Sequence, residues 1–201
     1  MAAVAVAKAR KWSETAMLVI DMQKEFILPG RRLHVPGSSS IVPSVITAVS
    51  TARDRGIPVI WVVREHDPYG RDVEFFRRHL YEDGNGPIRK GSDGVDLVDG
   101  LSVEDGEYRL VKTRFSAFFE THLNTVLHSI GIKNLVIVGV QTPNCIRQTV
   151  FDAVSLDYQQ ITVITDATAA ATLEIHNANI LDMKNVGVVA VELQDWIDLQ
   201  N

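Results

Sequence analysis

The sequence predicts an α/β fold in which helices cover both faces of a mainly parallel sheet of about six strands. Three observations support this prediction. Short continuous apolar runs, such as Ala-Met-Leu-Val-Ile at 16–20, are typical of strands buried on both faces of a parallel sheet. Segments of roughly 10–16 residues with helical spacing of apolar residues alternate with these runs. Polar or charged residues directly follow several runs, as Asp21 follows the first.

The expected strands follow the apolar runs, and the expected helices lie between stop signals. We expect strands at 16–20, 58–63, 108–111, 134–138, 160–164 and 186–191. We expect helices at 40–55, at 72–81, from Ser116 or Thr121 to Ser129, from Pro143 to residue 157, and at 172–184. Residues 82–106 carry many glycines and acids without periodicity, so we expect a long surface loop there with at most one turn of helix.

The composition predicts one globular domain. Of 201 residues, 46% are hydrophobic and 22% charged, which favours a single domain over 1–201 with residues 1–12 as a flexible lead-in. The net charge of -5 and the scattered lysines and arginines argue against a nucleic-acid partner. No apolar run reaches the roughly 18–20 residues of a membrane-spanning helix, so no membrane partner is expected. The single cysteine, Cys145, cannot form an internal disulfide, and we expect a cytoplasmic location.

Polar side chains gather at the predicted carboxyl ends of the strands. In parallel sheets ligands bind beyond these ends, so residues distant in sequence can meet on one rim. The residues at such positions are Asp21, residues 64–66, Lys112, residues 141–145 and Asp166. The sequence therefore predicts one polar site at this rim of the sheet.

Cys145 lies where a predicted strand and turn give way to a helix, and Pro143 suits the first helical position. With Thr142 as the cap, first-turn backbone N–H groups have no intrahelical partner and can stabilise a thiolate or hold an oxyanion. A nearby ammonium such as Lys112 adds to this stabilisation. Plainer interpretations stay open: Cys145 as a small buried hydrophobe, Asp21 as a turn cap and Lys112 as a solvated cation.

Three separated motifs resemble those of a known family. They are Val-Ile-Asp-Met-Gln-Lys-Glu-Phe at 19–26, Val-Lys-Thr-Arg-Phe-Ser-Ala-Phe at 111–118 and Val-Gly-Val-Gln-Thr-Pro-Asn-Cys at 138–145. In this order they resemble the isochorismatase-like cysteine hydrolases. Within that superfamily the chain is most similar to the nicotinamidase-related proteins and the ureidoacrylate- and biuret-type amidohydrolases. Three motifs in register are far more specific than any one of them.

The resemblance implies a six-stranded α/β/α sandwich and a catalytic triad of Asp21, Lys112 and Cys145. Cys145 would attack an amide carbonyl after passing its proton to Asp21, with Lys112 stabilising both anions. The backbone N–H groups of Gln141 and Cys145 would hold the oxyanion, next to a cis peptide bond between Val140 and Gln141. Water would then hydrolyse the thioester. The family also suggests a homo-oligomer.

Residues 64–67 depart from the family pattern. Metal-binding nicotinamidases carry Asp-x-His after the second strand, whereas this chain has Arg-Glu-His-Asp, so we expect no metal and no cofactor, and nicotinamide is disfavoured. True isochorismatases lack the cysteine, so that activity is disfavoured too. Arg64 and Arg114 indicate instead an anionic or ureido substrate, although Arg114 can equally be a structural ion-pair partner. Phe26 and Phe115 can line a small apolar pocket or belong to the core.

Three functions stay open at this point. The first is a metal-independent cysteine hydrolase that cleaves the C–N bond of a small amide or ureide through a thioester. The second is a catalytically silent nicotinamidase-like protein that binds a metabolite or a protein partner. The third, a thiol redox sensor, is disfavoured because the chain has no second cysteine to resolve an oxidised thiol.

Overall fold

The computed structural model describes residues 12–199, which fold around a six-stranded sheet of order β3-β2-β1-β4-β5-β6. The strands are β1 (Thr15–Ile20), β2 (Val59–Arg64), β3 (Tyr108–Lys112), β4 (Asn134–Val140), β5 (Gln160–Ala169) and β6 (Val189–Val191). Every neighbouring pair is parallel. The predicted α/β fold with a parallel six-stranded sheet is therefore confirmed.

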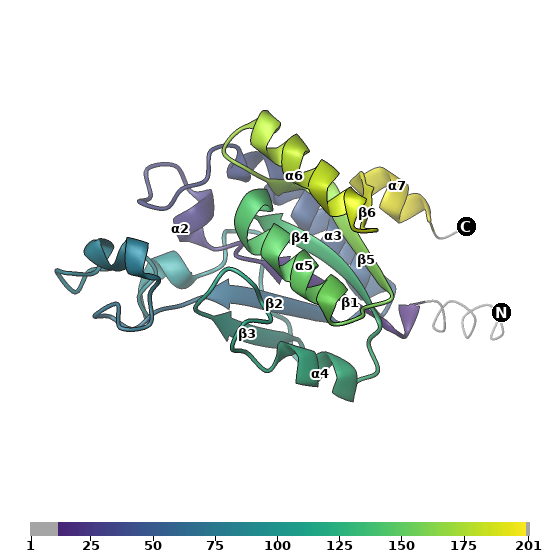
Figure 1. Cartoon of the computed structure of the whole chain (residues 1–201), viewed down its shortest axis with the longest axis horizontal. Coiled ribbons are helices and arrows are strands. Elements are labelled where there is room, and N and C mark those ends of the chain that lie inside the picture. The colour runs from purple at the N-terminus through teal and green to yellow at the C-terminus, as the bar shows by residue number, and fades with distance from the viewer. Residues whose placement is uncertain (1–11, 200–201) are drawn as a thin grey trace.

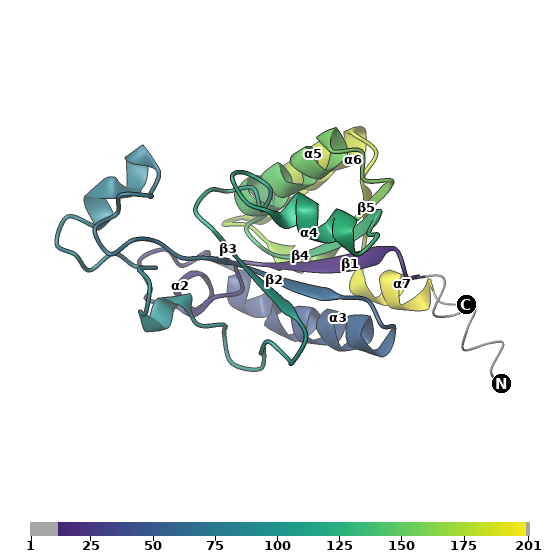
Figure 2. The same cartoon turned by 90° about the horizontal axis from the view of Figure 1, so that it is seen from below.

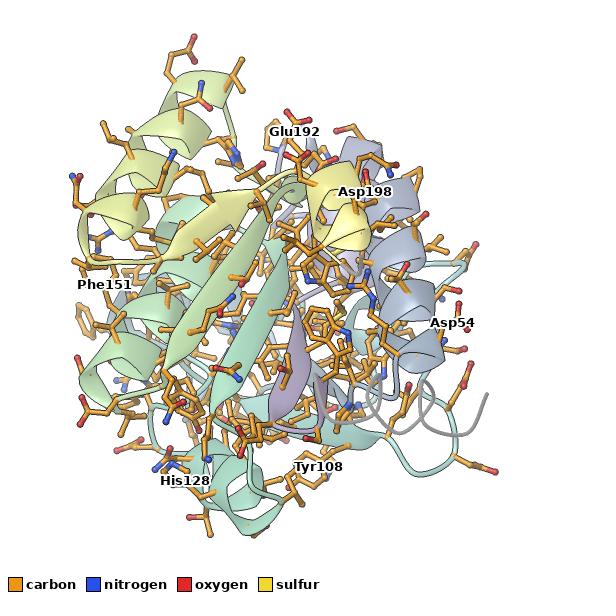
Figure 3. All side chains as sticks on the ribbon, turned by 90° about the vertical axis from the view of Figure 1, so that its right-hand side faces the viewer. Asp54, Tyr108, His128, Phe151, Glu192 and Asp198 are labelled. Atoms are coloured by element: carbon orange, nitrogen blue, oxygen red, sulfur yellow. The ribbon has the colours of Figure 1, made fainter. Side chains whose placement is uncertain are left out.

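Helices cover both faces of this sheet (Figure 1). They are α2 (Lys24–Ile27), α3 (Val42–Asp54), α4 (Leu123–Ser129), α5 (Arg147–Ser155), α6 (Leu173–Asn185) and α7 (Leu193–Asp198). Helices α3 and α7 lie on one face, and α4, α5 and α6 lie on the other (Figure 2). Figure 3 shows these layers end on, with Asp54 and Asp198 on one side of the strands and Phe151 on the opposite side. The result is a three-layer α/β/α sandwich.

Side chains of the central strands contribute to two hydrophobic cores, one on each face of the sheet. Met17 and Val19 of β1 pack into the core on the α3 side, and Leu18 and Ile20 pack into the core on the α5 side. All six residues of β1 and all six of β2 are buried. Burial on both faces explains why these strands read as continuous apolar runs without alternation.

Several segments outside the sheet are shorter or more irregular than predicted. The expected helix at 72–81 is a 3-10 helix, η2 (Phe75–Leu80), with no buried residue. The helix expected from Ser116 or Thr121 begins only at Leu123. Two other short 3-10 helices, η1 (Ser38–Ile41) and η3 (Asp93–Val95), and the short helices α2 and α7 have too few residues to give a periodic signal.

The segment 82–106 is less of a surface loop than its composition predicts. It contains no strand and only the single turn η3, yet part of it is buried in the core. Its buried apolar residues are Ile88, Val95, Val98 and Leu101. A backbone bridge between Gln23 and Leu97 ties the segment to the end of β1. The surface-loop prediction was wrong here, because isolated apolar residues without a period do not signal burial.

Two further expectations need correction. β5 continues to Ala169, so Asp166 lies inside the strand, where its Oδ1 accepts a hydrogen bond from the Leu193 N–H at 2.7 Å at the start of α7. Asp166 is therefore not a residue of the polar rim. Of the expected lead-in, residues 1–11 lie outside the described residues, and Trp12 packs its ring against Trp196. Within residues 12–199 no helix has the length and apolar character needed to cross a membrane.

Candidate active site

Strands β1 and β4 approach each other closely at their carboxyl ends. Ile20 is paired with Gly139, and a Cβ on Gly139 would lie only 2.0 Å from the Ile20 carbonyl oxygen. Gly139 also has a φ of 114°, a conformation open mainly to glycine. The next residue on the β1 side is Asp21, with a φ of 53°, and on the β4 side a cis peptide bond joins Val140 and Gln141. The glycine thus allows Asp21 to sit beside the turn after β4.

Three side chains from the ends of β1, β3 and the turn after β4 meet in the interior. Lys112 Nζ donates to Asp21 Oδ2 at 2.8 Å and lies 3.4 Å from Cys145 Sγ. It also donates to the carbonyl oxygen of Arg114 at 3.2 Å. Asp21 and Lys112 are each 1% exposed, and Cys145 is 6% exposed. The ammonium therefore contacts both the carboxylate and the sulfur in a site shielded from solvent.

The surroundings of Cys145 favour the neutral thiol at rest. Burial raises the pKa of Cys145, the negative charge of Asp21 raises it further, and the positive charges of Lys112 and Arg64 only partly offset these effects. The cation expected to stabilise a thiolate is present, but burial outweighs it. Nucleophilic attack then requires a base to remove the thiol proton, and the Asp21 carboxylate shares the Lys112 ammonium with the sulfur.

Cys145 lies in a π-helical turn, η4 (Thr142–Ile146), that precedes α5. The carbonyl oxygen of Gln141 accepts the Ile146 N–H at 3.3 Å, a bond between residues five apart that closes this wide turn. Thr142 was expected to cap the helix, but it lies inside the turn, and its hydroxyl contacts His176 Nδ1 at 2.9 Å. The cap prediction was wrong because the turn is wider than the first turn of an α-helix.

Two buried polar residues that support the site were not identified from the sequence. Thr149 Oγ1 donates to the carbonyl oxygen of Cys145 at 2.7 Å and accepts the Ala117 N–H at 2.9 Å, which ties α5 to the segment after β3. Gln23 receives the Arg64 N–H at 2.7 Å and donates to the Arg64 carbonyl at 2.8 Å, which fixes the end of β2. Gln23 belongs to the first motif, whereas nothing in the sequence marks Thr149.

A small enclosed cavity of about 20 Å³ adjoins Cys145. This volume has room for about one water molecule, so a larger ligand requires the walls to move. Its lining includes Asp21, Phe26, Arg64, Arg77, Phe115 and Gln141. A larger hollow of about 550 Å³ lies between η1, β5 and the start of α6, and its lining contains none of Asp21, Lys112 and Cys145.

The cavity brings together three of the four residues proposed to bind substrate: Phe26, Arg64 and Phe115. Arg114 is not among its lining residues. The Arg114 guanidinium instead donates from Nη1 to the carbonyl oxygens of Asp72 at 2.5 Å and Thr113 at 3.0 Å. The structure therefore places Arg114 in a backbone-bracing role, and its bonds go to carbonyls and not to a carboxylate partner.

The residues after β2 do not fit the metal that nicotinamidases bind. His66 Nδ1 contacts Asp72 Oδ1 at 3.2 Å, and Asp67 forms an ion pair with Arg71 at 2.5 Å. The guanidinium of Arg64, a buried cation, lines the cavity at this strand end. Across residues 12–199, no three His, Cys, Asp or Glu side chains are grouped so that they could hold a metal ion.

Comparisons with known proteins identify the family of this chain. The Isochorismatase domain model matches residues 15–195. A probable inactive nicotinamidase of Arabidopsis thaliana is 63% identical over 190 residues, covering 94% of this chain and 97% of that protein. The crystal structure of an isochorismatase family protein from Desulfovibrio vulgaris subsp. vulgaris str. Hildenborough is 41% identical with a TM-score of 0.90, covering 93% of this chain and 98% of that one. The pyrazinamidase of Pyrococcus horikoshii in complex with zinc is 25% identical with a TM-score of 0.76, covering 89% and 99%. The chain therefore belongs to the isochorismatase family.

Proposed function

We propose that this protein is a metal-independent cysteine hydrolase that cleaves the C–N bond of a small amide or ureide. One observation carries the proposal: the Lys112 ammonium lies 2.8 Å from Asp21 Oδ2 and 3.4 Å from Cys145 Sγ, beside an enclosed cavity. A nucleophile, a base and a cation that stabilises both are the parts that thiol-dependent acyl transfer requires. The substrate is a small molecule, and we place the reaction in the cytoplasm.

The chemistry begins with transfer of the Cys145 proton to Asp21. The thiolate attacks the amide carbonyl carbon, and the oxyanion lies against the backbone N–H groups of Gln141 and Cys145, each such donor being worth about 3–4 kcal/mol in an oxyanion site. Asp21 then gives the proton to the leaving nitrogen, which departs as ammonia or an amine and leaves a thioester. Water attacks the thioester carbonyl while losing a proton to Asp21, the Cys145 thiolate leaves and takes that proton back, and the carboxylic or carbamic acid is released.

Lys112 stabilises the anions that take part in proton transfer in this buried site. Its Nζ lies 2.8 Å from Asp21 Oδ2, on the residue that is the anion before proton transfer, and 3.4 Å from Cys145 Sγ, which is the anion afterwards. Because the site is desolvated, a fixed ammonium stabilises these anions more than it would in water. We therefore assign Asp21 as the base, Cys145 as the nucleophile and Lys112 as the electrostatic stabiliser.

A second candidate function is a silent protein that binds a metabolite or a protein partner. The name of the Arabidopsis thaliana relative, a probable inactive nicotinamidase, favours it. The first proposal accommodates that name, because loss of a metal site that holds nicotinamide does not disable hydrolysis of another amide. The two candidates make opposite predictions for turnover.

Ammonia release from a panel of small primary amides and ureides, neutral and carboxylate-bearing, separates the two. Under the first proposal, the wild type releases ammonia from at least one compound, and Cys145→Ala, with unchanged circular dichroism, releases none. Stabilisation of wild type and Cys145→Ala to the same extent by one compound in thermal-shift assays, without turnover of any compound, would instead support the silent binding protein.

A further inference from the structure

Arg64 is a buried cation whose hydrogen-bonding capacity is only partly used. It is 1% exposed and lines the cavity beside Cys145. Its Nη1 donates to Glu74 Oε1 at 2.7 Å, but its Nε and Nη2 have no hydrogen-bond partner among the described residues. Buried polar groups are normally satisfied, and an unpaired one destabilises the fold, more so when it is charged. The open donors therefore call for a partner that enters the cavity.

The charges around Arg64 also leave one positive charge unbalanced. Arg64 and Arg77 share a single acid, because Glu74 Oε1 lies 2.7 Å from Arg64 Nη1 and 3.4 Å from Arg77 Nη1. Burial lowers the pKa of Arg77, and the positive charge of Arg64 lowers it further. Lys112 and Asp21 neutralise each other at 2.8 Å. A ligand with one negative charge would complete this arrangement.

We propose that Arg64 binds a carboxylate of the substrate through its Nε–H and Nη2–H, so that the substrate class is a short acid carrying a primary amide or a terminal ureido group. This inference rests on the proposed hydrolase function and names its substrate class. Two adjacent N–H groups of one guanidinium match the two oxygens of a carboxylate, whereas a neutral amide oxygen presents one acceptor atom.

The walls of the cavity set the remaining requirements. The Arg64 guanidinium lies 5.1 Å from the centre of the Phe115 ring, which forms one apolar wall, and Phe26 adds a second. The substrate therefore has a short chain between its carboxylate and its amide. Arg77 closes the outside, with its guanidinium 4.7 Å from the Phe76 ring and 5.2 Å from the Phe115 ring.

Entry of such a substrate requires this outer wall to move. Arg77 and Phe76 belong to η2, which has no buried residue. Residues 70–95, which include η2, extend away from the three layers on the side toward which the arrowheads of β2 and β3 point (Figure 1), and Figure 2 shows the same projection. Because η2 itself has no buried residue, it is the part of this segment that opens at the lowest free-energy cost.

Binding to the Cys145→Ala variant tests the proposal without depending on turnover. The probes are malonamate and succinamate, each compared with its neutral diamide by isothermal titration calorimetry. We expect the Cys145→Ala protein to bind one or both carboxylates about 10- to 100-fold more tightly than the matching diamide. Adding Arg64→Lys, which keeps the charge and removes the fork, should reduce this preference to below about threefold. Adding Arg109→Gln, which removes a cation of β3 paired with Glu65, should leave it unchanged.

A second variant covers the case in which Arg64→Lys does not fold. Arg64→Gln keeps Glu74 paired with Arg77 at 3.4 Å, so no buried carboxylate is left alone, and it should also abolish the preference for carboxylates. Equal binding of carboxylate and diamide by Cys145→Ala, no binding of either carboxylate, or a preference that survives the loss of Arg64 overturns the proposal. Turnover of neutral amides alone would overturn it and leave the hydrolase function standing. Arg64-dependent binding without ammonia release would support carboxylate binding by Arg64 and overturn the hydrolase function.

Discussion

Replacing Lys112 with methionine tests whether the ammonium holds the buried site together. Methionine keeps most of the side-chain length but leaves the Asp21 carboxylate, 1% exposed, without its ion pair at 2.8 Å. Removing one member of a buried ion pair costs about 3–5 kcal/mol, because a charge stays behind in the interior. Arg64 also acts on Asp21 electrostatically, so we expect the lower value, about 3 kcal/mol. For a chain of this length the melting temperature should then fall by roughly 6–12 °C.

Urea unfolding of the wild type, Lys112→Met, Asp21→Asn and the double variant provides the measurement. The double variant has no unpaired charge, so it should be more stable than Lys112→Met although it carries one more substitution. All three variants should lose amide hydrolysis. A decrease in the free energy of unfolding of less than about 1 kcal/mol in Lys112→Met, or a double variant that is the least stable of the set, would show that Lys112 does not stabilise the buried Asp21 carboxylate.

Three further predictions follow from the same structure. Asp21→Asn removes the negative charge that helps to raise the pKa of Cys145, so the ultraviolet absorbance of the thiolate should appear at lower pH than in the wild type. The variant should also lose hydrolysis. A midpoint of the thiolate titration that stays or rises would contradict this prediction. Gly139→Ala would place a Cβ 2.0 Å from a backbone oxygen at a φ of 114°, so urea unfolding should show a loss of stability of about 3–5 kcal/mol. Gly131 also has a positive φ but no atom within 4 Å of an added Cβ, so Gly131→Ala should lose only about 1 kcal/mol. Similar losses in the two variants would contradict the close approach of β1 and β4. Burial lowers the pKa of His66 from 6.5 to about 4. Stability that is fully present above pH 6.5 should therefore be lost, by on the order of 3 kcal/mol, as the pH falls through about 4. His66→Phe should flatten that part of the profile, and a profile that His66→Phe leaves unchanged would contradict the prediction.

The sheet and the three polar residues could be predicted from local signals. Each central strand is buried on both faces, so its apolar run stands out in the sequence. Parallel strands end on one rim, so Asp21, Lys112 and the turn with Cys145 could be assigned to one place before any distance was known. The contact of Lys112 Nζ with both other side chains agrees with that assignment.

The rest of the site depends on contacts that have no local signal. Arg64 and Arg114 look alike in the sequence, yet one guanidinium lines the cavity and the other donates to backbone carbonyls, because the segment 70–95 decides which partners are near. Arg77 lies on η2, a six-residue 3-10 helix with no buried residue, so no apolar pattern in the sequence marks the side that faces the cavity. The direction of the Cys145 pKa shift depends mainly on burial, which spacing alone does not measure.

In the proposed reaction Cys145 forms the covalent intermediate. Mass spectrometry of an acid-quenched reaction, with an amide that the wild type hydrolyses, detects this intermediate directly. We expect the acyl part of the substrate on the peptide that contains Cys145, formed together with the first equivalent of ammonia, and neither product in Cys145→Ala. Ammonia release by Cys145→Ala at the rate of the wild type, with no adduct on Cys145 in the wild type, would contradict it.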